Sequence, residues 1–510
     1  MDPVRLAELL PVLRADLIGC AGTEFVRRVT IDSREIRPSD LFWSLRGERH
    51  DGHTFAPQAI ASGAIAAVVD RQHANQIAGP RLVVENTQTA LAQLAAWYRK
   101  QSEALVIGVT GSVGKTTTRE LIYSVLSVRH PGLRSRKNYN NEIGLPLSLL
   151  DLASEHEFAA LELGAGKIGD IQSLCEIALP EAGVITRIGP AHLQSFGSLD
   201  AIYQAKGELL EALPCHGFAI VGGDDPRMRD MARRAGCSTT FIGEGPENQL
   251  RAVDVDFQPG RLKFTVDRQR YELAVPARHY LTSALAALAV AREIGMEQAD
   301  IVEGFQSFVG PPSRCQVESL GSWTLIDDSY NASPLAMEAA CDCLRTWPTS
   351  GQRVLVCGDM LELGAESPHW HSELGATVAR SGIDRLLTYG EHAHHTARGA
   401  RSAGLPIHQI AAFQEFEPLL AILDCWLADI NSPVHSHRSD TPPEPAAASS
   451  TQTTNTHRPP KPPIHRETEF VLSRASDLRE SCGTIQFRLD GSTKTPDQVV
   501  SGSITLVVAS

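Results

Sequence analysis

The chain has 510 residues, a formal net charge of −13 and 42% hydrophobic residues. This length is typical of about three domains, and the apolar content is enough for a buried core in each of them. The negative charge argues against a general nucleic-acid-binding protein, and the lack of a long apolar run argues against membrane insertion.

The N-terminus and the cysteines indicate the compartment. Residues 1–5 lack the basic and then apolar pattern of a signal peptide. The ten cysteines are scattered, and the close pair Cys341 and Cys343 lies inside a helical pattern. We therefore expect a cytoplasmic protein whose reduced thiols pack as small apolar groups.

Residues 1–86 are predicted to form a first, small α/β domain. Strand-like segments at 29–34 and 40–45 lead into polar loops, and the apolar run at 64–70 fits a buried strand. Ligand-binding loops often lie at such strand ends. Four polar side chains gather there: Ser33, Arg34, Arg46 and His53. They indicate either a binding site or ordinary solvated loops.

A glycine-rich loop marks the second domain, which we assign to residues 87–312. A helix at 88–100 and an apolar run at 104–107 lead into Thr110-Gly111-Ser112-Val113-Gly114-Lys115-Thr116-Thr117, and a helix-like segment at 119–128 follows. In such loops backbone N–H groups and the lysine bind phosphates, and the next hydroxyl holds a magnesium ion. The full eight-residue pattern needs glycine where Val109 stands. This loop is a shorter variant, and the alternative is an ordinary strand-to-helix turn.

Apolar strands recur after this loop with helical segments between them, at 158–161, 183–186 and 218–221. This alternation predicts a mostly parallel sheet with right-handed crossovers, whose ligands bind beyond the carboxyl ends of the strands.

Three polar residues follow these strands: Glu162, His192 in the next loop, and Lys206 at or near the start of a helix that runs to residue 213. Glu162 and His192 are candidate magnesium ligands, although magnesium prefers oxygen. The alternatives are a capping or surface carboxylate, a hydrogen-bonded loop histidine and an exposed lysine.

The third domain, residues 313–510, is predicted to be a smaller, Rossmann-like α/β sheet. Short strands at 325–326, 354–356 and 386–389 alternate with helices. Residues 431–467 contain eight prolines and almost no large apolar groups, so we expect a disordered insert. A proline-rich docking segment is the alternative. Further strands are expected at 470–472, 485–489 and 504–508.

Several strings together resemble the Mur ligases, the ATP-dependent amide-forming enzymes of peptidoglycan precursor synthesis. They are Asp32-Ser33-Arg34, Asp51-Gly52-His53, the phosphate loop, Asn140-Asn141-Glu142, Glu162-Leu163-Gly164, Ala205-Lys206-Gly207-Glu208, Asp328-Ser329-Tyr330-Asn331 and Gly358-Asp359-Met360-Leu361-Glu362-Leu363-Gly364. Sister ligases carry a histidine where this chain has Tyr330, so the chain is most similar to the MurF type.

The resemblance implies a reaction. ATP phosphorylates the terminal carboxylate of UDP-N-acetylmuramoyl-tripeptide, the amine of D-alanyl-D-alanine attacks the acyl phosphate, and ADP and phosphate are released. A carboxylate is a poor electrophile, so it needs this activation, and the charge on the transferring phosphoryl group must be neutralised. The alternatives are another Mur-type ligase, a nucleotide-binding protein without ligase activity, and a phosphate-loop kinase.

The resemblance also implies roles for individual residues of a monomeric enzyme. The catalytic set is Lys115, Glu162, His192 and Lys206. ATP would contact residues 110–117, His279, Arg314 and Asp328. Two magnesium ions would be held by Thr116, Glu162, His192 and Lys206, the last as a carbamate. The UDP end of the substrate would meet Ser33, Arg34 and Arg46, the reacting centre Asn140 and Asn141, and the dipeptide Asn331.

The chain departs from the family at two places. The family pattern Gly-x-His-Asn-x-x-Asn-Ala is replaced by residues 277–284, where Tyr280 and Ser283 stand for the two asparagines. We expect Tyr280 to stack on adenine and Ser283 to keep one hydrogen bond, which predicts weaker or altered nucleotide selectivity. The late Lys-Gly-Ser-Arg motif is Arg474-Ala475-Ser476-Asp477 here, so no role is assigned to it.

Overall fold

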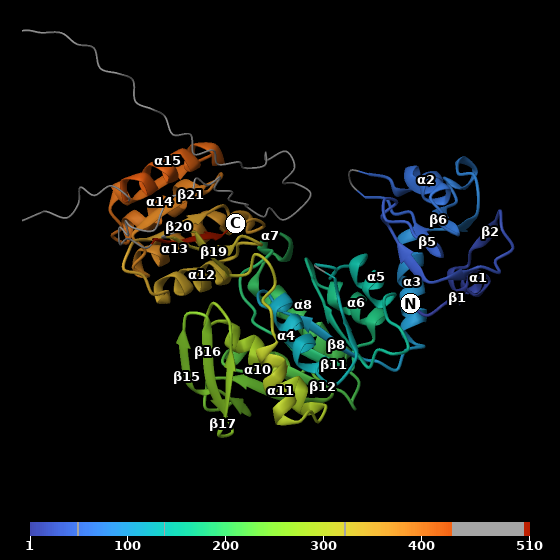
Figure 1. Cartoon of the computed structure of the whole chain (residues 1–510), viewed down its shortest axis with the longest axis horizontal. Coiled ribbons are helices and arrows are strands. Elements are labelled where there is room, and N and C mark those ends of the chain that lie inside the picture. The colour runs from blue at the N-terminus through green and yellow to red at the C-terminus, as the bar shows by residue number, and fades with distance from the viewer. Residues whose placement is uncertain (48–49, 137, 321–322, 431–503, 510) are drawn as a thin grey trace, which may run out of the picture.

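The computed structural model describes residues 1–47, 50–136, 138–320, 323–430 and 504–509. Sheets of five, seven and six strands follow one another along the chain, and an antiparallel sheet of three strands lies beside the second (Figure 1). The prediction of an α/β protein with three sheets is confirmed. The expected insert at 431–467, the strands at 470–472 and 485–489, and the motif at 474–477 lie outside the described residues.

The N-terminal sheet has the order β2-β7-β6-β5-β4, and only β2 pairs antiparallel. Its strands are β2 (Asp16–Ile18), β4 (Arg28–Thr30), β5 (Asp40–Trp43), β6 (Ala66–Asp70) and β7 (Arg81–Val84). Strands β1 (Val4–Arg5) and β3 (Phe25–Val26) form a separate pair, and α1 (Leu6–Leu13), α2 (Ala56–Ala61) and the short 3₁₀ helices η1 (Gly52–Phe55) and η2 (Ala74–Gln76) complete this part. All of β5 is buried, as expected for a strand with both faces covered.

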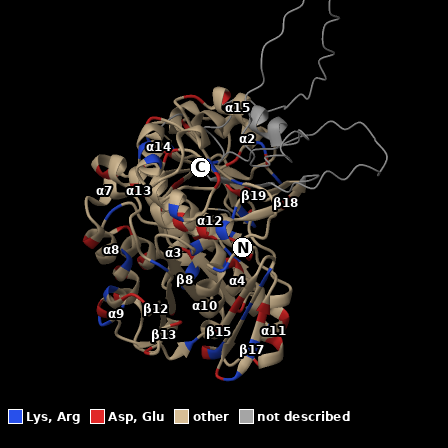
Figure 2. Cartoon of the chain, turned by 90° about the vertical axis from the view of Figure 1, so that its left-hand side faces the viewer, with Lys and Arg blue, Asp and Glu red and all other residues tan. Residues whose placement is uncertain are grey.

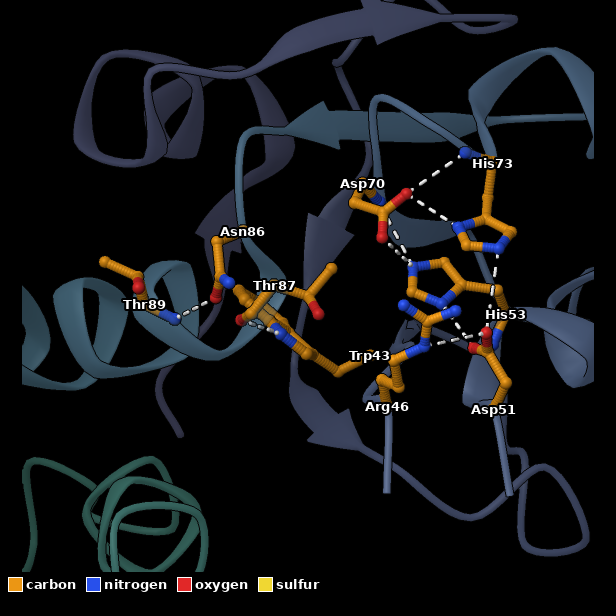
Figure 3. Close-up of polar contacts among 9 residues, drawn as sticks. All are labelled: Trp43, Arg46, Asp51, His53, Asp70, His73, Asn86, Thr87 and Thr89. Carbon is orange, nitrogen blue, oxygen red and sulfur yellow. Dashed lines mark hydrogen bonds and ion pairs between the residues drawn. The ribbon is translucent and has the colours of Figure 1, made fainter. Parts of the chain in front are cut away.

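A buried tryptophan joins this sheet to helix α3 (Thr87–Arg99). Trp43 is fully buried and its indole Nε1 donates a hydrogen bond to the carbonyl of Thr87, 2.8 Å away. Asn86 caps the same helix, because its side-chain oxygen accepts a 2.9 Å hydrogen bond from Thr89 N (Figure 3). The first turn of α3 is therefore fixed from both sides.

The central sheet is entirely parallel, with the order β14-β13-β12-β11-β8-β10-β9. Its strands are β8 (Leu105–Thr110), β9 (Gly132–Arg134), β10 (Phe158–Glu162), β11 (Ala182–Ile185), β12 (Phe218–Gly222), β13 (Ser238–Gly243) and β14 (Leu250–Arg251). The chain leaves β8 toward β9 and β10 on one side and later adds β11 on the other. The strand order thus reverses at β8, where ligands bind in open α/β sheets.

Helices cover this sheet on both faces (Figure 1). Besides α3 they are α4 (Lys115–Leu126), α5 (Gly144–Leu149), α6 (Asp170–Ala178), α7 (Leu193–Phe196), α8 (Leu199–Ala212), α9 (Pro226–Ala232), α10 (Tyr280–Glu293) and α11 (Gln298–Gln306). The antiparallel sheet is formed by β15 (Val253–Gln258), β16 (Arg261–Val266) and β17 (Gln269–Leu273). Lys206 was expected near the start of its helix, but α8 begins seven residues earlier at Leu199, because Ser198 provides the N-cap.

The C-terminal sheet has the order β18-β19-β23-β20-β21-β22, and only β18 pairs antiparallel. Its strands are β18 (Gln316–Leu320), β19 (Trp323–Asp328), β20 (Arg353–Cys357), β21 (Arg385–Tyr389), β22 (Ile410–Phe413) and β23 (Ile504–Ala509). Its helices are α12 (Pro334–Thr346), α13 (Ser367–Arg380), α14 (Ala393–Ser402) and α15 (Phe416–Ile430), with η3 (Gly364–Glu366) and η4 (Ile407–Gln409).

Three further observations on the described residues concern thiols, helix hydrophobicity and charge. Cys341 and Cys343 are buried in α12 as free thiols. Within the described ranges, no helix combines the length and the apolar character that a bilayer crossing requires. Basic and acidic residues are interspersed along the elements drawn in Figure 2.

Candidate active site

The glycine-rich loop follows β8, and α4 begins directly after it at Lys115. Gly111 has φ 150° and Gly114 has φ 84°. A Cβ atom at Gly111 would lie 2.1 Å from the hydroxyl of Thr186, so this position requires glycine. The structure confirms the predicted position of the loop, between a buried strand and the N-terminus of a helix. The free N–H groups at such a helix end favour an anion.

Lys115 lies over this loop. Its ammonium donates hydrogen bonds to the carbonyls of Gly111, at 2.9 Å, and Ser112, at 3.2 Å. Burial lowers the pKa of Lys115 from its ordinary value, while the negative charge of Glu162 acts in the opposite direction. The Lys115 ammonium thus places a positive charge at the loop, where burial limits its solvation by water.

Glu162, the last residue of β10, is 2% exposed and lies beside the loop. Its carboxylate accepts hydrogen bonds from the Thr116 hydroxyl and from the side-chain amide of Asn140, each 2.9 Å away. The Arg119 guanidinium lies 3.5 Å from the same carboxylate. A surface carboxylate is therefore the wrong interpretation of Glu162. The Glu162 oxygens and the Thr116 hydroxyl form a compact set of oxygen atoms next to the loop, and such atoms can act as metal ligands.

Lys206 projects from α8 and is 3% exposed, so its interpretation as an exposed lysine is wrong. Its ammonium lies 5.9 Å from the centroid of the Phe196 ring. Burial lowers the pKa of Lys206 to about 7, and the positive charge of Lys115 contributes to the shift. A substantial fraction of the amine, about half, is therefore in its neutral, nucleophilic form near pH 7.

Glu208, which belongs to the Ala205-Lys206-Gly207-Glu208 motif but was not a candidate site residue, fixes the surroundings of Lys206. Glu208 is 6% exposed, and its carboxylate accepts hydrogen bonds from the backbone N–H groups of Gly169, at 2.7 Å, and Gln172, at 3.0 Å. These are free N–H groups at the start of α6. Glu208 thus joins α8 to the loop that follows β10.

His192 connects the central and C-terminal parts. It caps α7 with a φ of 54°, and its Nδ1 hydrogen-bonds the Glu362 carboxylate in the 358–364 loop. The backbone N–H of Gln194 donates to the Glu362 carbonyl at 2.9 Å. Glu362 belongs to the 358–364 motif that resembles the Mur ligases, but it was not predicted to be a site residue. The contact could not be inferred from sequence, because it depends on how two sheets face one another.

A cavity of about 250 Å³ lies between these two parts of the chain. The central part contributes Ser112, Lys115, Thr116, Asn140, Glu162 and His192 to its lining, and the C-terminal part contributes Arg314, Tyr330, Asn331, Ser333, Leu361 and Glu362. The cavity thus brings together most of the candidate catalytic residues.

Arg314 lies just before β18, and Asp328 is the last residue of β19. The Arg314 guanidinium lies 3.9 Å from the centroid of the Tyr330 ring, a cation–π contact at the cavity wall. Asp328 accepts a 3.1 Å hydrogen bond from Cys315 N, and burial raises its pKa to about 6. It is not among the residues that line the cavity.

The expected roles of Tyr280 and Ser283 are wrong. Tyr280 is 1% exposed and its ring packs edge-on against Phe308, so it cannot stack on a base. Ser283 is 4% exposed and accepts a 2.8 Å hydrogen bond from the Thr118 hydroxyl of α4. Both residues are part of the interior that supports α10. His279 is exposed, and its ring stacks on Tyr280 with 5.1 Å between centroids.

The remaining candidates do not all meet at the cavity. Arg34 pairs with Asp32 at 2.7 Å, and Arg46 lies 3.6 Å from Asp51; both arginines and Ser33 belong to the N-terminal part. Asn141 accepts hydrogen bonds from the N–H groups that open α5, which is a capping role.

Comparison with known proteins gives a consistent family assignment. The model of the Mur ligase family catalytic domain matches residues 26–99, that of the Mur ligase middle domain residues 109–291, and that of the glutamate ligase domain residues 313–427. The chain is 36% identical over 401 residues to the UDP-N-acetylmuramoyl-tripeptide–D-alanyl-D-alanine ligase of Escherichia coli (strain K12), covering 77% of this chain and 87% of that protein. The Bacillus subtilis (strain 168) ligase of the same name is 36% identical over 379 residues, covering 74% and 82%.

Solved structures agree. MurF from Acinetobacter baumannii matches with a TM-score of 0.78 at 32% identity, over 84% of this chain and 94% of that chain. The MurF ligase of Thermotoga maritima in complex with ADP matches with a TM-score of 0.70 at 25% identity, over 95% and 94%.

Proposed function

The chain belongs to the Mur ligase family, and from that membership we propose that it is an ATP-dependent amide ligase of the cytoplasm that joins D-alanyl-D-alanine to UDP-N-acetylmuramoyl-tripeptide. The observation that carries the proposal is the contact between the Thr116 hydroxyl and the buried Glu162 carboxylate beside the glycine-rich loop. It gives the site the oxygen donors that phosphoryl transfer from ATP needs.

The chain's own residues suit phosphoryl transfer to a carboxylate. The loop N–H groups and Lys115 would bind the β- and γ-phosphates, and Asn140, held against Glu162, would orient the substrate carboxylate. Attack of a carboxylate oxygen on the γ-phosphorus would form the acyl phosphate and release ADP. Attack of the dipeptide amine on the carbonyl carbon would then form the amide and release phosphate, with loss of one proton from nitrogen.

The donor set fits Mg²⁺. A hydroxyl and a carboxylate 2.9 Å apart supply the oxygen ligands that this ion prefers, whereas His192 would add a less usual nitrogen ligand. The ion would supply neutralising charge for the transferring phosphoryl group. Thr116 and Glu162 would hold one ion, and His192 and Lys206 are the candidates for a second.

Lys206 is proposed to act as a carbamate. Its neutral amine would attack carbon dioxide and lose a proton, which replaces a cation by an anionic group with two oxygens. Burial supports this step, because only the neutral amine is nucleophilic and the pKa of Lys206 is lowered to about 7. The modification would also relieve the repulsion between Lys206 and Lys115.

Arg314 and Asn331, which line the cavity from the C-terminal part, would close over ATP and the dipeptide. The His192–Glu362 contact would help to hold this closed arrangement. Ser33, Arg34 and Arg46 would bind the UDP end of the substrate.

A product assay tests the proposal. The protein is given ATP, Mg²⁺, the UDP-linked tripeptide and D-alanyl-D-alanine, and phosphate release and product mass are followed. Phosphate release that requires both substrates, with a product of the pentapeptide mass, is the expected result. A phosphorylated end product would indicate a kinase, and release with a different amino acid would indicate another Mur-type ligase. Absence of phosphate release with every pair of substrates would indicate a nucleotide-binding protein without ligase activity.

A further inference from the structure

A leucine of the C-terminal part lies directly on a glycine of the central part, beside the cavity. Gly189 follows β11 and is buried, and a Cβ atom there would lie 2.2 Å from Leu335 Cδ1 and 2.7 Å from Leu335 Cγ. Leu335 is the second residue of α12, which lies on the side of the C-terminal part that faces the central part (Figure 1). A methyl group at Gly189 would displace Leu335, because turning the tip of the leucine alone does not free Cγ.

Space, and not backbone conformation, accounts for glycine at this position. The φ angle of Gly189 lies outside the left-handed region that favours glycine, whereas those of Gly111 and Gly114 lie inside it. The backbone would therefore accept alanine at Gly189. What an alanine methyl would disturb is the contact with Leu335.

Hydrogen bonds fix Gly189 to the phosphate loop. The Ser112 hydroxyl donates to the Gly189 carbonyl at 2.8 Å, and it accepts from Gly189 N at 3.0 Å. Two residues earlier in the chain, the Arg187 carbonyl accepts a 2.7 Å hydrogen bond from Ser112 N. Ser112 belongs to the loop that is proposed to bind the ATP phosphates, so the position of Gly189 depends on the position of that loop.

On its other side, Leu335 is joined to residues of the cavity wall. Ser333 caps α12 by accepting a 3.4 Å hydrogen bond from Ala336 N, and Ser333 and Ala336 both line the cavity. Asn331, the residue proposed to contact the dipeptide, lies two residues before this cap. Because these residues belong to or precede the first turn of one helix, a shift of Leu335 moves them together.

We propose that Leu335 is a positioning residue: seated on Gly189, it sets how far Asn331 and the first turn of α12 stand from the phosphate loop. This inference rests on the proposed function, in which the C-terminal part closes over ATP and the dipeptide. The contacts from Ser112 to Gly189 and from Gly189 to Leu335 link the loop to α12. Nucleotide binding at the loop would thus order the surface on which the C-terminal part docks.

The competing interpretation is that Leu335 only fills space between the two parts. The His192–Glu362 contact and the 2.9 Å hydrogen bond from Gln194 N to the Glu362 carbonyl would then hold the closed arrangement by themselves. In that case a change at Gly189 or Leu335 would cost stability but would have no specific effect on turnover or on the response to nucleotide.

Hydrogen exchange of the full-length protein, with and without Mg²⁺ and ADP, separates the two interpretations. In the wild type we expect ADP to slow exchange in residues 187–194 and also in residues 332–338. In Gly189→Ala the nucleotide should still protect the phosphate loop, whereas residues 332–338 should no longer respond. Gly183→Ala is the matched control, because a Cβ atom there would lie 2.9 Å from Leu213 Cδ1, inside the central part. It should lower the melting temperature and leave the response of 332–338 unchanged.

A double-mutant cycle on turnover gives a second readout. Gly189→Ala and Leu335→Ala should each lower kcat, whereas the KM for the UDP-linked tripeptide should change little, since its UDP end is assigned to the N-terminal part. In Gly189→Ala/Leu335→Ala, the new methyl group takes up part of the space that the leucine leaves. The kcat of the double variant should therefore exceed the value expected from the two single effects by about 5- to 10-fold, as for residues in direct contact.

Several results would overturn the proposal. One is a wild type in which ADP does not affect residues 332–338, or a Gly189→Ala variant that responds like the wild type. Single effects on kcat that simply multiply, or a response lost equally in Gly183→Ala, would mean that Leu335 is ordinary packing. If the wild type makes no product with any pair of substrates, the ligase function fails and the exchange result alone decides on this contact. Melting curves of each variant separate loss of the contact from loss of the fold.

Discussion

Tyr280 donates a hydrogen bond from its hydroxyl to the main-chain carbonyl of Arg314, 2.9 Å away. A side chain of α10 thereby holds the segment that enters the C-terminal sheet. The Arg314 guanidinium lies over the Tyr330 ring and lines the cavity. The residue that replaces a family asparagine thus supports a candidate ATP-binding arginine from behind.

Tyr280→Phe keeps the buried ring and removes only this hydrogen bond. A bond of this kind contributes about 1 kcal/mol, so we expect the KM for ATP to rise about fivefold with a smaller change in kcat. Tyr271→Phe is the control, because its hydroxyl donates at 2.8 Å to Gln298, away from the cavity. Tyr271→Phe also removes the 3.2 Å hydrogen bond from Arg292, so it should lose at least as much stability. An equal rise in KM in the two variants would contradict the positional role.

Restoring the family's asparagines is expected to harm the protein. Tyr280 and Ser283 are both buried, and replacing the aromatic ring with an amide leaves a cavity and an unpaired polar group. The double variant Tyr280→Asn/Ser283→Asn should lose about 3–5 kcal/mol of unfolding free energy, measured by urea titration. A stable double variant with tighter ATP binding would instead support the adenine role expected from sequence.

Glu162→Gln tests the oxygen donors at the phosphate loop. The amide keeps the shape of the side chain but removes the charge that faces Thr116, so kcat should fall by at least about 100-fold. The Mg²⁺ concentration that gives half-maximal ATP-dependent activity should rise in the same assay. Glu120→Gln is the control, because Glu120 of α4 pairs with Arg119 of the same helix and with Arg134 of β9. Comparable loss of activity in both would indicate a general structural effect.

Lys206 predicts a pH dependence of activity. Carbamate formation needs the neutral amine, so activity in limiting bicarbonate should fall as the pH drops below about 7, the lowered pKa of Lys206. Added bicarbonate should restore activity most strongly on the acidic side. Lys206→Ala should be inactive at every pH, whereas Lys167→Ala, at an exposed position nearby, should behave like the wild type. Activity of Lys206→Ala that equals wild type would exclude the carbamate.

Lys206 also predicts a pH dependence of stability in bicarbonate-free buffer. Its pKa is 10.5 in the unfolded chain and about 7 in the fold. Between these values the unfolded chain binds more protons, so the unfolding free energy should rise with pH, by roughly 2 kcal/mol from pH 7 to pH 9 at most. Lys206→Met should flatten this slope. An unchanged slope would mean that the lysine is solvated in the native protein.

The Glu362 contact with His192 predicts an effect on closure. Glu362→Ala should weaken the contact between the central and C-terminal parts, lower kcat and increase the radius of gyration in small-angle scattering with ATP bound. Glu366→Ala removes an exposed carboxylate four residues away and should alter neither quantity. Lower kcat with no change in scattering would point to a local role for Glu362 at the cavity.

The parts of the fold that depend on local pattern could be predicted from sequence. The strand before Gly111, the helix after it and the position of Glu162 at a strand end follow from apolar runs and glycine placement. The burial of Tyr280, the Glu362 contact and the approach of Leu335 to Gly189 depend on residues distant in sequence. No periodicity encodes such contacts, so the role predicted for Tyr280 was wrong and the other two were missed.

The order of strands in the C-terminal sheet has a consequence for biosynthesis. β19 and β20 do not pair with each other, since each pairs in parallel with β23, the last of the described strands to be made. Before β23 is made, the chain can form only two separate parts of this sheet, β18-β19 and β20-β21-β22. The edges of β19 and β20 that later pair with β23 are then unpaired. Open edges recruit foreign strands, so this interval is where a chaperone would protect the chain and where misassembly would begin.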